Sequence, residues 1–554
     1  MAFALTFSSC LIQTPTAFAD DSDGDFRPGN LLVSRVIYDN DPNNVVAGVT
    51  LLPPNCVGSA CVTATDSGAY PNVWNNVLVD GSFGITAKIV LDQMTRSGFL
   101  ISSLEVPNSS QRHVSPTSDQ MVGSFSSKSE VALNLSTDKR FVTFTGYLAP
   151  VNAIDVSNSN TPFVVDPSNP VPGQNYRVVA KVDQHGKFHF TKTNAYSGNN
   201  GRAAILNDNA SSNILYTAGN GGNGGTPQPD GVIVGAGAQI LSAQDKPLRA
   251  QMDPGLPTPV GSFSIAQLGL KADKVGKDTN FRGLTIFNDV VYYTKGSGSN
   301  GINTVYFIDT TGFDSNSNPL ACPNGVGVPG PSAALPTAPI VYNASLLQTK
   351  GVFPYNMCIL KGFSTTLAKS ATSFPFGIWF ANATTLYVAD EGDGDNTFDP
   401  ATGRYTAAAK QTTAGLQKWT FDSKLGAWKQ AYVLNTGLDL GVPYTVRGYP
   451  TGNNPATKLP WSPATDGLRN ITGRVNRDGT ATIWAITSTV SGNGDQGADP
   501  NKLVMITDNL AATVLPPGER FTAIRTARFG EVLRGVSFTP GTGVPPHRDD
   551  EDEP

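Results

Sequence analysis

The chain has 554 residues, with 57 glycines, 40 prolines, 15% charged residues and a net charge of −5. No long stretch places apolar residues three and four positions apart, so this turn-rich composition argues against a helical protein. Lys and Arg form no cluster, which argues against a broad surface for nucleic acid or an anionic membrane. Any partner is therefore expected to be neutral, cationic or a locally bound anion.

The N-terminus has the features of a secretory signal covering residues 1–19. An apolar run from Phe3 to Ile12 precedes Ala17-Phe18-Ala19, and acidic residues follow the expected cleavage after Ala19. A lipoprotein that carries its lipid on Cys10 is the weaker alternative. No other segment has the roughly 18 uninterrupted apolar residues that a membrane span needs. The mature chain is expected to be secreted or periplasmic.

Four cysteines follow the predicted signal, and their even number suggests two disulfides in an exported protein. Proximity in the sequence favours Cys56 with Cys61 and Cys322 with Cys358. A zinc site would usually add histidines to the thiolates, and the whole chain has only 4 histidines. We therefore expect disulfides rather than zinc.

Short strands separated by turns fill the first half of the mature chain. The expected strands are 30–38, 87–92 and 99–106, then 129–135, 141–147, 176–182 and 187–194, then 201–206 and 214–218 with others near Val232 and Ile240. The second set has four strands and is therefore complete, and the hairpin signal Gln184-His185-Gly186 joins its last two strands. The first set has one strand fewer than the four of a propeller blade.

A repeated phrase organises the second half. The stretch from Phe281 to Asp309, FRGLTIFNDVVYYTKGSGSNGINTVYFID, alternates short apolar strands with tight turns, and 375–395, FPFGIWFANATTLYVADEGDGD, repeats the pattern. The expected strands are 284–287, 290–294, 304–308 and an outer strand near 340–347, then 376–381, 385–389, 416–422 and 427–434, then 468–475, 481–488, 502–507 and 521–527. A lone strand follows, LRGVSF at 533–538, which echoes FRGLTI.

The incomplete first set and the lone last strand are complementary halves of one blade. We therefore predict an all-β fold, a six-bladed β-propeller in which the C-terminal strand closes the N-terminal blade. A seventh blade within 219–265 is the alternative. Residues 20–540 would form this single domain, and residues 541–554, which end in consecutive acids, would form a disordered tail.

Inner strands of a propeller begin at one rim of the central channel, and the loops between second and third strands emerge at the same rim. The cations expected there are Arg202, Arg282, Arg469, Arg534 and Lys295. Because guanidinium groups match carboxylate and phosphate oxygens, the pattern predicts an anion site. The alternative is structural, with each Arg paired to an acid of a neighbouring blade such as Asp390, Glu391, Asp466 or Glu531.

Carboxylates are the candidate general bases, since no histidine falls in the predicted rim loops. The candidates are Glu130, Asp390, Glu391, Asp466 and Asp495. The loop 390–399 also alternates oxygen ligands with glycines, as Ca²⁺ sites do, and predicts a metal site at Asp390, Asp393, Asp395 and Asp399. The stretch 21–25 is a shorter loop of the same kind. Solvated turns are the alternative at both places.

The phrases FRGLTIFNDVVYYTKGSGSNGINTVY, FPFGIWFANATTLYVADEGDGD, DGLRNITGRVN and LRGVSFTP resemble a group of exported, largely uncharacterised β-propeller proteins. More distantly, the six-bladed architecture is similar to calcium-dependent phytases and gluconolactonase-like hydrolases. This resemblance implies a channel that holds a metal and an anionic or lactone substrate, but no full set of metal ligands from either family matches residue by residue.

Two functions follow as expectations. The first is an exported propeller that binds a small anionic or polyhydroxy ligand at the channel rim, with calcium-dependent ester or lactone hydrolysis left open. The second is a non-enzymatic extracellular scaffold or recognition module for a protein or glycan. An enzyme should concentrate perturbed carboxylates in one concave site, whereas a scaffold should expose an apolar patch.

Overall fold

A computed structural model describes most of the chain. It covers residues 25–39, 41–52, 56–65, 68, 85–115, 120–124, 130–164, 173–220, 237–243, 259–263, 265–270, 280–296, 301–316, 318–339, 355–494 and 496–544. The predicted signal peptide and residues 545–554 lie outside this part. Residues 541–544 belong to the ordered domain, since Gly541 N donates to Lys139 O at 2.8 Å.

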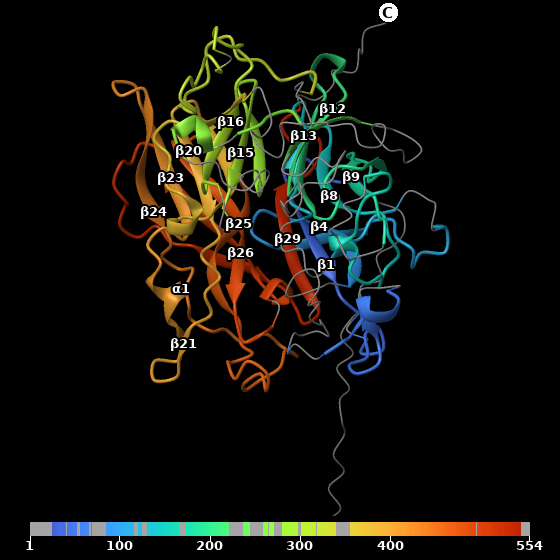
Figure 1. Cartoon of the computed structure of the whole chain (residues 1–554). Coiled ribbons are helices and arrows are strands. Elements are labelled where there is room, and N and C mark those ends of the chain that lie inside the picture. The colour runs from blue at the N-terminus through green and yellow to red at the C-terminus, as the bar shows by residue number, and fades with distance from the viewer. Residues whose placement is uncertain are drawn as a thin grey trace, which may run out of the picture.

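Six sheets in this part of the chain, antiparallel except for one short strand in blade 4, form the predicted six-bladed propeller (Figure 1). From the inside outward, blade 1 contains β29 (Glu531–Phe538), β1 (Leu31–Ile37), β4 (Thr86–Met94) and β5 (Leu100–Glu105), with β6 (Gly123–Ser124) also paired to β4. Blade 2 contains β7 (Asn134–Leu135), β8 (Val142–Tyr147), β9 (Arg177–Val182) and β10 (Phe188–Thr193). Blade 3 contains β11 (Gly201–Asn207), β12 (Ile214–Gly219) and β13 (Ala238–Ser242).

The other three blades follow in chain order. Blade 4 contains β14 (Gly283–Phe287), β15 (Val290–Lys295), β16 (Thr304–Ile308) and β18 (Met357–Leu360), to which β17 (Val326–Gly327) adds in parallel. Blade 5 contains β19 (Pro375–Asn382), β20 (Thr385–Asp390), β23 (Gly415–Asp422) and β24 (Ala427–Leu434). Blade 6 contains β25 (Ala464–Val475), β26 (Thr480–Val490), β27 (Lys502–Asn509) and β28 (Thr522–Thr526).

Loops carry the remaining small elements. These are the hairpin of β2 (Leu51–Leu52) and β3 (Val62–Thr63), the hairpin of β21 (Phe398–Asp399) and β22 (Arg404–Tyr405), and the helix α1 (Thr406–Lys410). None of the helices within the described ranges has the length and apolarity needed to cross a membrane.

The C-terminal strand closes the N-terminal blade, as the sequence predicted. Strand β29 pairs antiparallel with β1, from Leu31 opposite Phe538 to Ile37 opposite Glu531. Figure 1 shows these two strands, one red and one blue, side by side. Inner strands also touch in circular order, β29 with β7, β7 with β11, β11 with β14, β14 with β19, β19 with β25 and β25 with β29. The ring is therefore complete.

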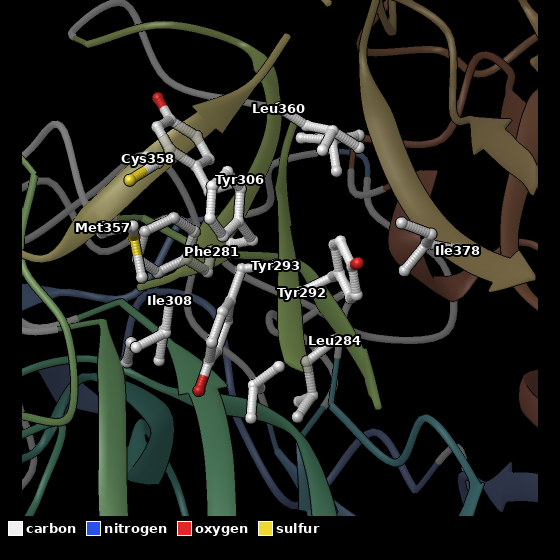
Figure 2. Packing of buried hydrophobic residues seen from close by; sticks show 14 of the residues in the cluster. Phe281, Leu284, Tyr292, Tyr293, Tyr306, Ile308, Met357, Cys358, Leu360 and Ile378 are labelled. Atoms are coloured by element: carbon white, nitrogen blue, oxygen red, sulfur yellow. The ribbon is translucent and has the colours of Figure 1, made fainter. Parts of the chain in front are cut away.

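Apolar side chains fill the spaces between blades. One cluster joins blades 3, 4 and 5, and at its centre Phe281 packs edge-on against Tyr306 with ring centroids 5.5 Å apart (Figure 2). Phe281 also lies 5.2 Å from the ring of Tyr293. Another cluster joins Trp484 of blade 6 to Leu533 of β29. Burial of such aromatic surfaces is a major source of stability, so each blade depends on its neighbours.

Close packing between blades explains the glycine that recurs in the inner strands, after an arginine at Gly283 and Gly535 and after Phe376 at Gly377. A Cβ on Gly283 would lie 2.3 Å from the carbonyl oxygen of Phe376, and one on Gly377 would lie 2.4 Å from that of Arg469. Gly535 approaches Val131 O in the same way, at 2.6 Å. In each case the contact is with the inner strand of the next blade or with the segment leading into it. Only a residue without a side chain allows this approach.

Two predicted strands lie outside the described residues and stay untested. The expected outer strand of blade 4 at 340–347 lies outside the described residues, and the strand that pairs with β16 is β18. Similarly, the strand expected near Val232 lies outside the described residues, whereas the one near Ile240 is confirmed as β13. Both predicted disulfides are supported, with Cα separations of 5.4 Å for Cys56–Cys61 and 5.9 Å for Cys322–Cys358.

Candidate functional site

Six charged side chains, one from each blade, lie in, just before or beside the first half of the inner strands. Four are the arginines predicted from the inner strands. Blade 5 has Phe376-Gly377 at the equivalent place and instead supplies Glu391, which directly follows β20, and blade 2 supplies Glu130, ahead of β7. In circular order, this charged ring consists of Glu130, Arg202, Arg282, Glu391, Arg469 and Arg534.

Glu391 connects the blades on either side of its own. Its Oε2 lies 3.2 Å from Nε of Arg469 in blade 6, and its Oε1 lies 3.6 Å from Nε of Arg282 in blade 4. The first contact is a hydrogen bond and the second is a longer ion pair. The backbone of Glu391 is also fixed, because its N–H donates to Phe374 O at 3.0 Å. The structural alternative for the arginines therefore accounts for this part of the ring.

Arg202 has a different environment, although it is only 5% exposed. Its Nη1 donates to Asn280 Oδ1 and, at 3.1 Å, to Phe281 O, both of which are neutral acceptors. Its Nε has no hydrogen-bond partner among the described residues. Burial lowers the pKa of Arg202 well below its usual value and the charge of Arg282 lowers it further, while Glu391 and Glu130 oppose both effects. The charge of Arg202 is thus only partly compensated.

Arg534 and Glu130 meet at Ser124, which completes the ring between blades 1 and 2. The backbone N–H of Ser124 donates to Glu130 Oε1 at 2.7 Å, and its carbonyl oxygen accepts from Arg534 Nη2 at 3.3 Å. Arg534 Nη2 also donates to the hydroxyl of Tyr38 at 2.9 Å. Both charged residues are buried, with exposures of 1% for Glu130 and 4% for Arg534.

The order of charges leaves two pairs of neighbouring arginines. Arg202 is followed by Arg282, and Arg469 is followed by Arg534, and within each pair one guanidinium lowers the pKa of the other. Burial is the larger cause of the lowered pKa values of both Arg202 and Arg469. Four arginines and two glutamates give the ring a formal surplus of two positive charges. Such a surplus in a poorly solvated place is expected to attract an anion.

Asp390 has a structural role beside the ring. It is fully buried, and its carboxylate accepts hydrogen bonds from Ser373 Oγ at 2.7 Å, Phe374 N at 2.8 Å, Gln417 Nε2 at 2.9 Å and Gly392 N at 3.0 Å. Burial raises its pKa to about 6 despite these donors. Because the donors occupy both oxygens, Asp390 holds the loop that presents Glu391.

Asp466 is the other acid buried near the ring. It accepts from Gly394 N at 2.9 Å and from Gln411 Nε2 at 2.6 Å, and it thereby fixes the loop that follows Glu391. Burial, and after it the charge of Asp393, raises the pKa of Asp466 to about 7. This carboxyl ties the β20–β23 loop to the inner strand of blade 6.

The acids of the loop 390–399 cap turns individually. Asp393 accepts from Asp395 N at 2.9 Å, Asp395 from Thr397 N at 2.8 Å, and Asp399 from Ala401 N at 2.9 Å. No three His, Cys, Asp or Glu side chains are grouped as a metal site in the ranges that the structure covers. Calcium at Asp390, Asp393, Asp395 and Asp399 stays a prediction, as does calcium at 21–25, of which only Asp25 lies within the described ranges.

Lys295 lies beside the charged ring, at the end of β15 and next to Arg282, whose backbone N–H donates to Thr294 O at 2.8 Å. Lys295 is fully buried, and its Nζ donates to Asn303 Oδ1 of its own blade at 3.0 Å. Asp495 lies outside the described residues. His185 is in an exposed turn beside Asp25, and His189 is in the outer strand β10, as predicted. Sequence reasoning placed Glu391 and Glu130 at the rim but missed that they fill the two ring positions without Arg.

Comparison with known proteins does not show a family for this chain. No protein-family model matches the chain, and no curated protein matches it either. An endo-1,4-β-xylanase of Bacteroides thetaiotaomicron is similar over 74% of this chain and 99% of its own, with 9% identity and a TM-score of 0.27. The cobalt-substituted ACO of Synechocystis is similar over 83% of this chain and 60% of its own, with 7% identity and a TM-score of 0.22. These low scores support no argument, so the architecture rests on the sheets themselves.

Proposed function

We propose that this propeller binds a small polyvalent anion at the charged ring. The observation that carries the proposal is the formal surplus of two positive charges among six side chains that are buried or nearly so. Like charges held together in a poorly solvated place raise the free energy of the fold. A bound anion would offset this cost and would satisfy guanidinium donors such as Nε of Arg202.

The order of charges around the ring favours a ligand with two anionic groups. One glutamate stands between the pairs Arg202–Arg282 and Arg469–Arg534 on each side of the ring. The two pairs still interact, since, besides burial, Arg469 also lowers the pKa of Arg282 across Glu391. Each pair can take one carboxylate or phosphate through the planar fork of its guanidinium groups. Hydroxyl groups on the same ligand could donate to Glu130 and Glu391, which suits a polyhydroxy acid.

Ester or lactone hydrolysis is the enzymatic extension of this proposal, with or without calcium. It would require a carboxylate that faces the bound ligand and accepts a proton from water. Glu130 and Glu391 are ring members and are the candidates for that role. Asp390 is a weaker candidate because four donors already occupy its oxygens.

Thermal unfolding with and without citrate tests the proposal. A ligand that binds only the folded state raises the melting temperature by mass action, so citrate should raise it more than sodium chloride at equal ionic strength. Arg202→Gln should remove most of this shift. Arg140→Gln is the control, because the Arg140 side chain is 62% exposed and pairs with Asp138 away from the ring. A wild-type protein that shows no shift with citrate or phosphate would refute anion binding.

A further inference from the structure

A hollow opens at the end of the channel away from the charged ring. Its volume is about 920 Å³, and it is lined by the ends of the inner strands of all six blades. None of the six residues of the charged ring lines it. This exit cavity has the size of sites that take small organic molecules. Sequence reasoning placed all chemistry at the other rim and did not predict it.

The deep part of the exit cavity is aliphatic. Ile205 of β11, Ile378 of β19 and Ile471 of β25 face it from three blades, with exposures of 4%, 6% and 6%. These positions lie between the charged ring and the hairpin turns at the opposite rim. Water gains few hydrogen bonds against such a surface, so an apolar group would be favoured there.

Two aromatic side chains that line the exit cavity, Trp379 and Phe287, stack on neighbouring residues. The ring of Trp379 lies flat on β25, where a Cβ on Gly473 would be 2.5 Å from the ring, and it stacks on Tyr387 at 5.8 Å. Phe287 stacks on Phe380 with centroids 4.5 Å apart. Trp379 therefore offers no open face on which a sugar or a planar ligand could stack, and one face of Phe287 is taken by Phe380. The edges of these aromatic rings and the three isoleucines instead favour binding of an aliphatic chain in the cavity.

The rim of the exit cavity carries more positive than negative charge. Exposed Lys139 and Arg474 lie at the rim, and Asp289 is the acid among the lining residues. Since two cations and one acid lie at the rim of an aliphatic interior, a ligand with an apolar tail and an anionic head is complementary to both parts. We infer that the exit cavity binds an aliphatic carboxylate, with the chain inside and the carboxylate at Lys139 and Arg474.

This site is independent of the charged ring, and titration calorimetry with decanoate tests it. Wild-type protein should bind decanoate in the presence of saturating citrate. Thr472→Trp places an indole in the cavity from a half-buried lining position and should abolish binding. Thr522→Trp makes the same change on the exposed outer strand β28 and should bind like the wild type.

The head group is tested with decanol as a matched uncharged probe. Replacing Lys139 and Arg474 together by Gln removes two exposed charge pairs with the carboxylate, so it should weaken decanoate binding by about two- to thirtyfold and leave decanol binding unchanged. Thr285→Phe is a second cavity-filling variant if Thr472→Trp melts early. The inference would be overturned if the wild type did not bind decanoate, or if the filled variants bound it as well as the wild type. It would also be overturned if the double variant kept the wild-type ratio of decanoate affinity to decanol affinity.

Discussion

Arg35 and Glu531 are 496 positions apart in the chain, and their side chains form an ion pair of 2.7 Å. The pair joins β1 to β29 within the blade that closes the ring. Arg35 also bonds Asp92 of β4 at 2.8 Å, and Asp92 in turn contacts Arg525 of blade 6 at 2.8 Å. These contacts join the first and last strands of the propeller and the junction with blade 6 in one polar network.

Deleting the chain from Glu531 onward should therefore prevent normal folding. The deletion removes the inner strand of blade 1, exposes Leu31 and Val33, which are buried in the structure, and leaves Arg35 without one of its acids. Because a domain is stable by only about 5–15 kcal/mol, the loss of a core strand should abolish the cooperative transition. Deleting only residues 545–554 is the control. Thermal unfolding followed by circular dichroism compares the two truncations with the full chain. Equal melting temperatures for all three proteins would contradict the interlocked ring.

Most of the fold could be predicted because its signal is local. In blade 5, alternating apolar residues and tight turns delimit strands that the structure gives as β19, β20, β23 and β24. Blade 4 was harder, since its long insertion offers more than one apolar segment. In the structure, β18 is the outer strand of this blade, because it pairs with β16 and carries Cys358 of the bridge to Cys322. Such long-range contacts do not produce a periodic pattern of apolar residues in the sequence.

Gly377→Ala should destabilise the propeller. The new Cβ would lie 2.4 Å from the backbone oxygen of Arg469, which cannot move without shifting the inner strand of blade 6. Overpacking of this kind costs about 1–3 kcal/mol. Gly173→Ala is the matched control, because its Cβ would meet its nearest atom at 3.7 Å. Urea denaturation should show the loss for the first variant alone, and equal midpoints would show that the inner strands do not depend on this contact.

The bond between Cys322 and Cys358 should matter more than the bond between Cys56 and Cys61. It closes a loop of sequence separation 36, against 5 for the other, and it anchors the outer strand β18. Chain entropy gives a loss of roughly 3–4 kcal/mol for Cys322→Ala with Cys358→Ala, and a smaller loss for the other pair. Mass mapping of nonreduced protein checks the pairing, and free thiols at all four positions would overturn it.

Stability should fall as the pH rises from about 4 to 8. Asp499 is fully buried and accepts from Tyr449 Oη at 2.8 Å and Ser491 Oγ at 3.0 Å, yet burial raises its pKa to about 7. Since the folded pKa exceeds the unfolded one, its contribution is complete below about pH 4 and is lost as the pH passes 7. Urea midpoints at pH 5 and pH 8 should differ less in Asp499→Asn than in the wild type or in exposed Asp439→Asn. An unchanged difference would show that Asp499 is ionised in the fold.

The candidate site was only partly predictable. The arginines could be located because they recur at one position of a repeated strand. The glutamates occupy the equivalent ring places in blades 5 and 2 but come from outside the inner strands, so no repeat aligns them with the arginines. Burial of Arg202 among neutral acceptors also follows from the closed ring and has no local sequence signal.

Calorimetric titration of citrate into three proteins tests the central claim most directly. If the surplus positive charge of the ring binds the anion, Arg469→Gln should weaken binding by about 1.5–3 kcal/mol. Glu391→Gln should bind citrate at least as tightly as the wild type, although loss of the contacts with Arg282 and Arg469 should lower its melting temperature. The affinities should therefore rise from Arg469→Gln to wild type to Glu391→Gln. Lack of citrate binding by the wild type, or equal affinities in all three proteins, would contradict the account.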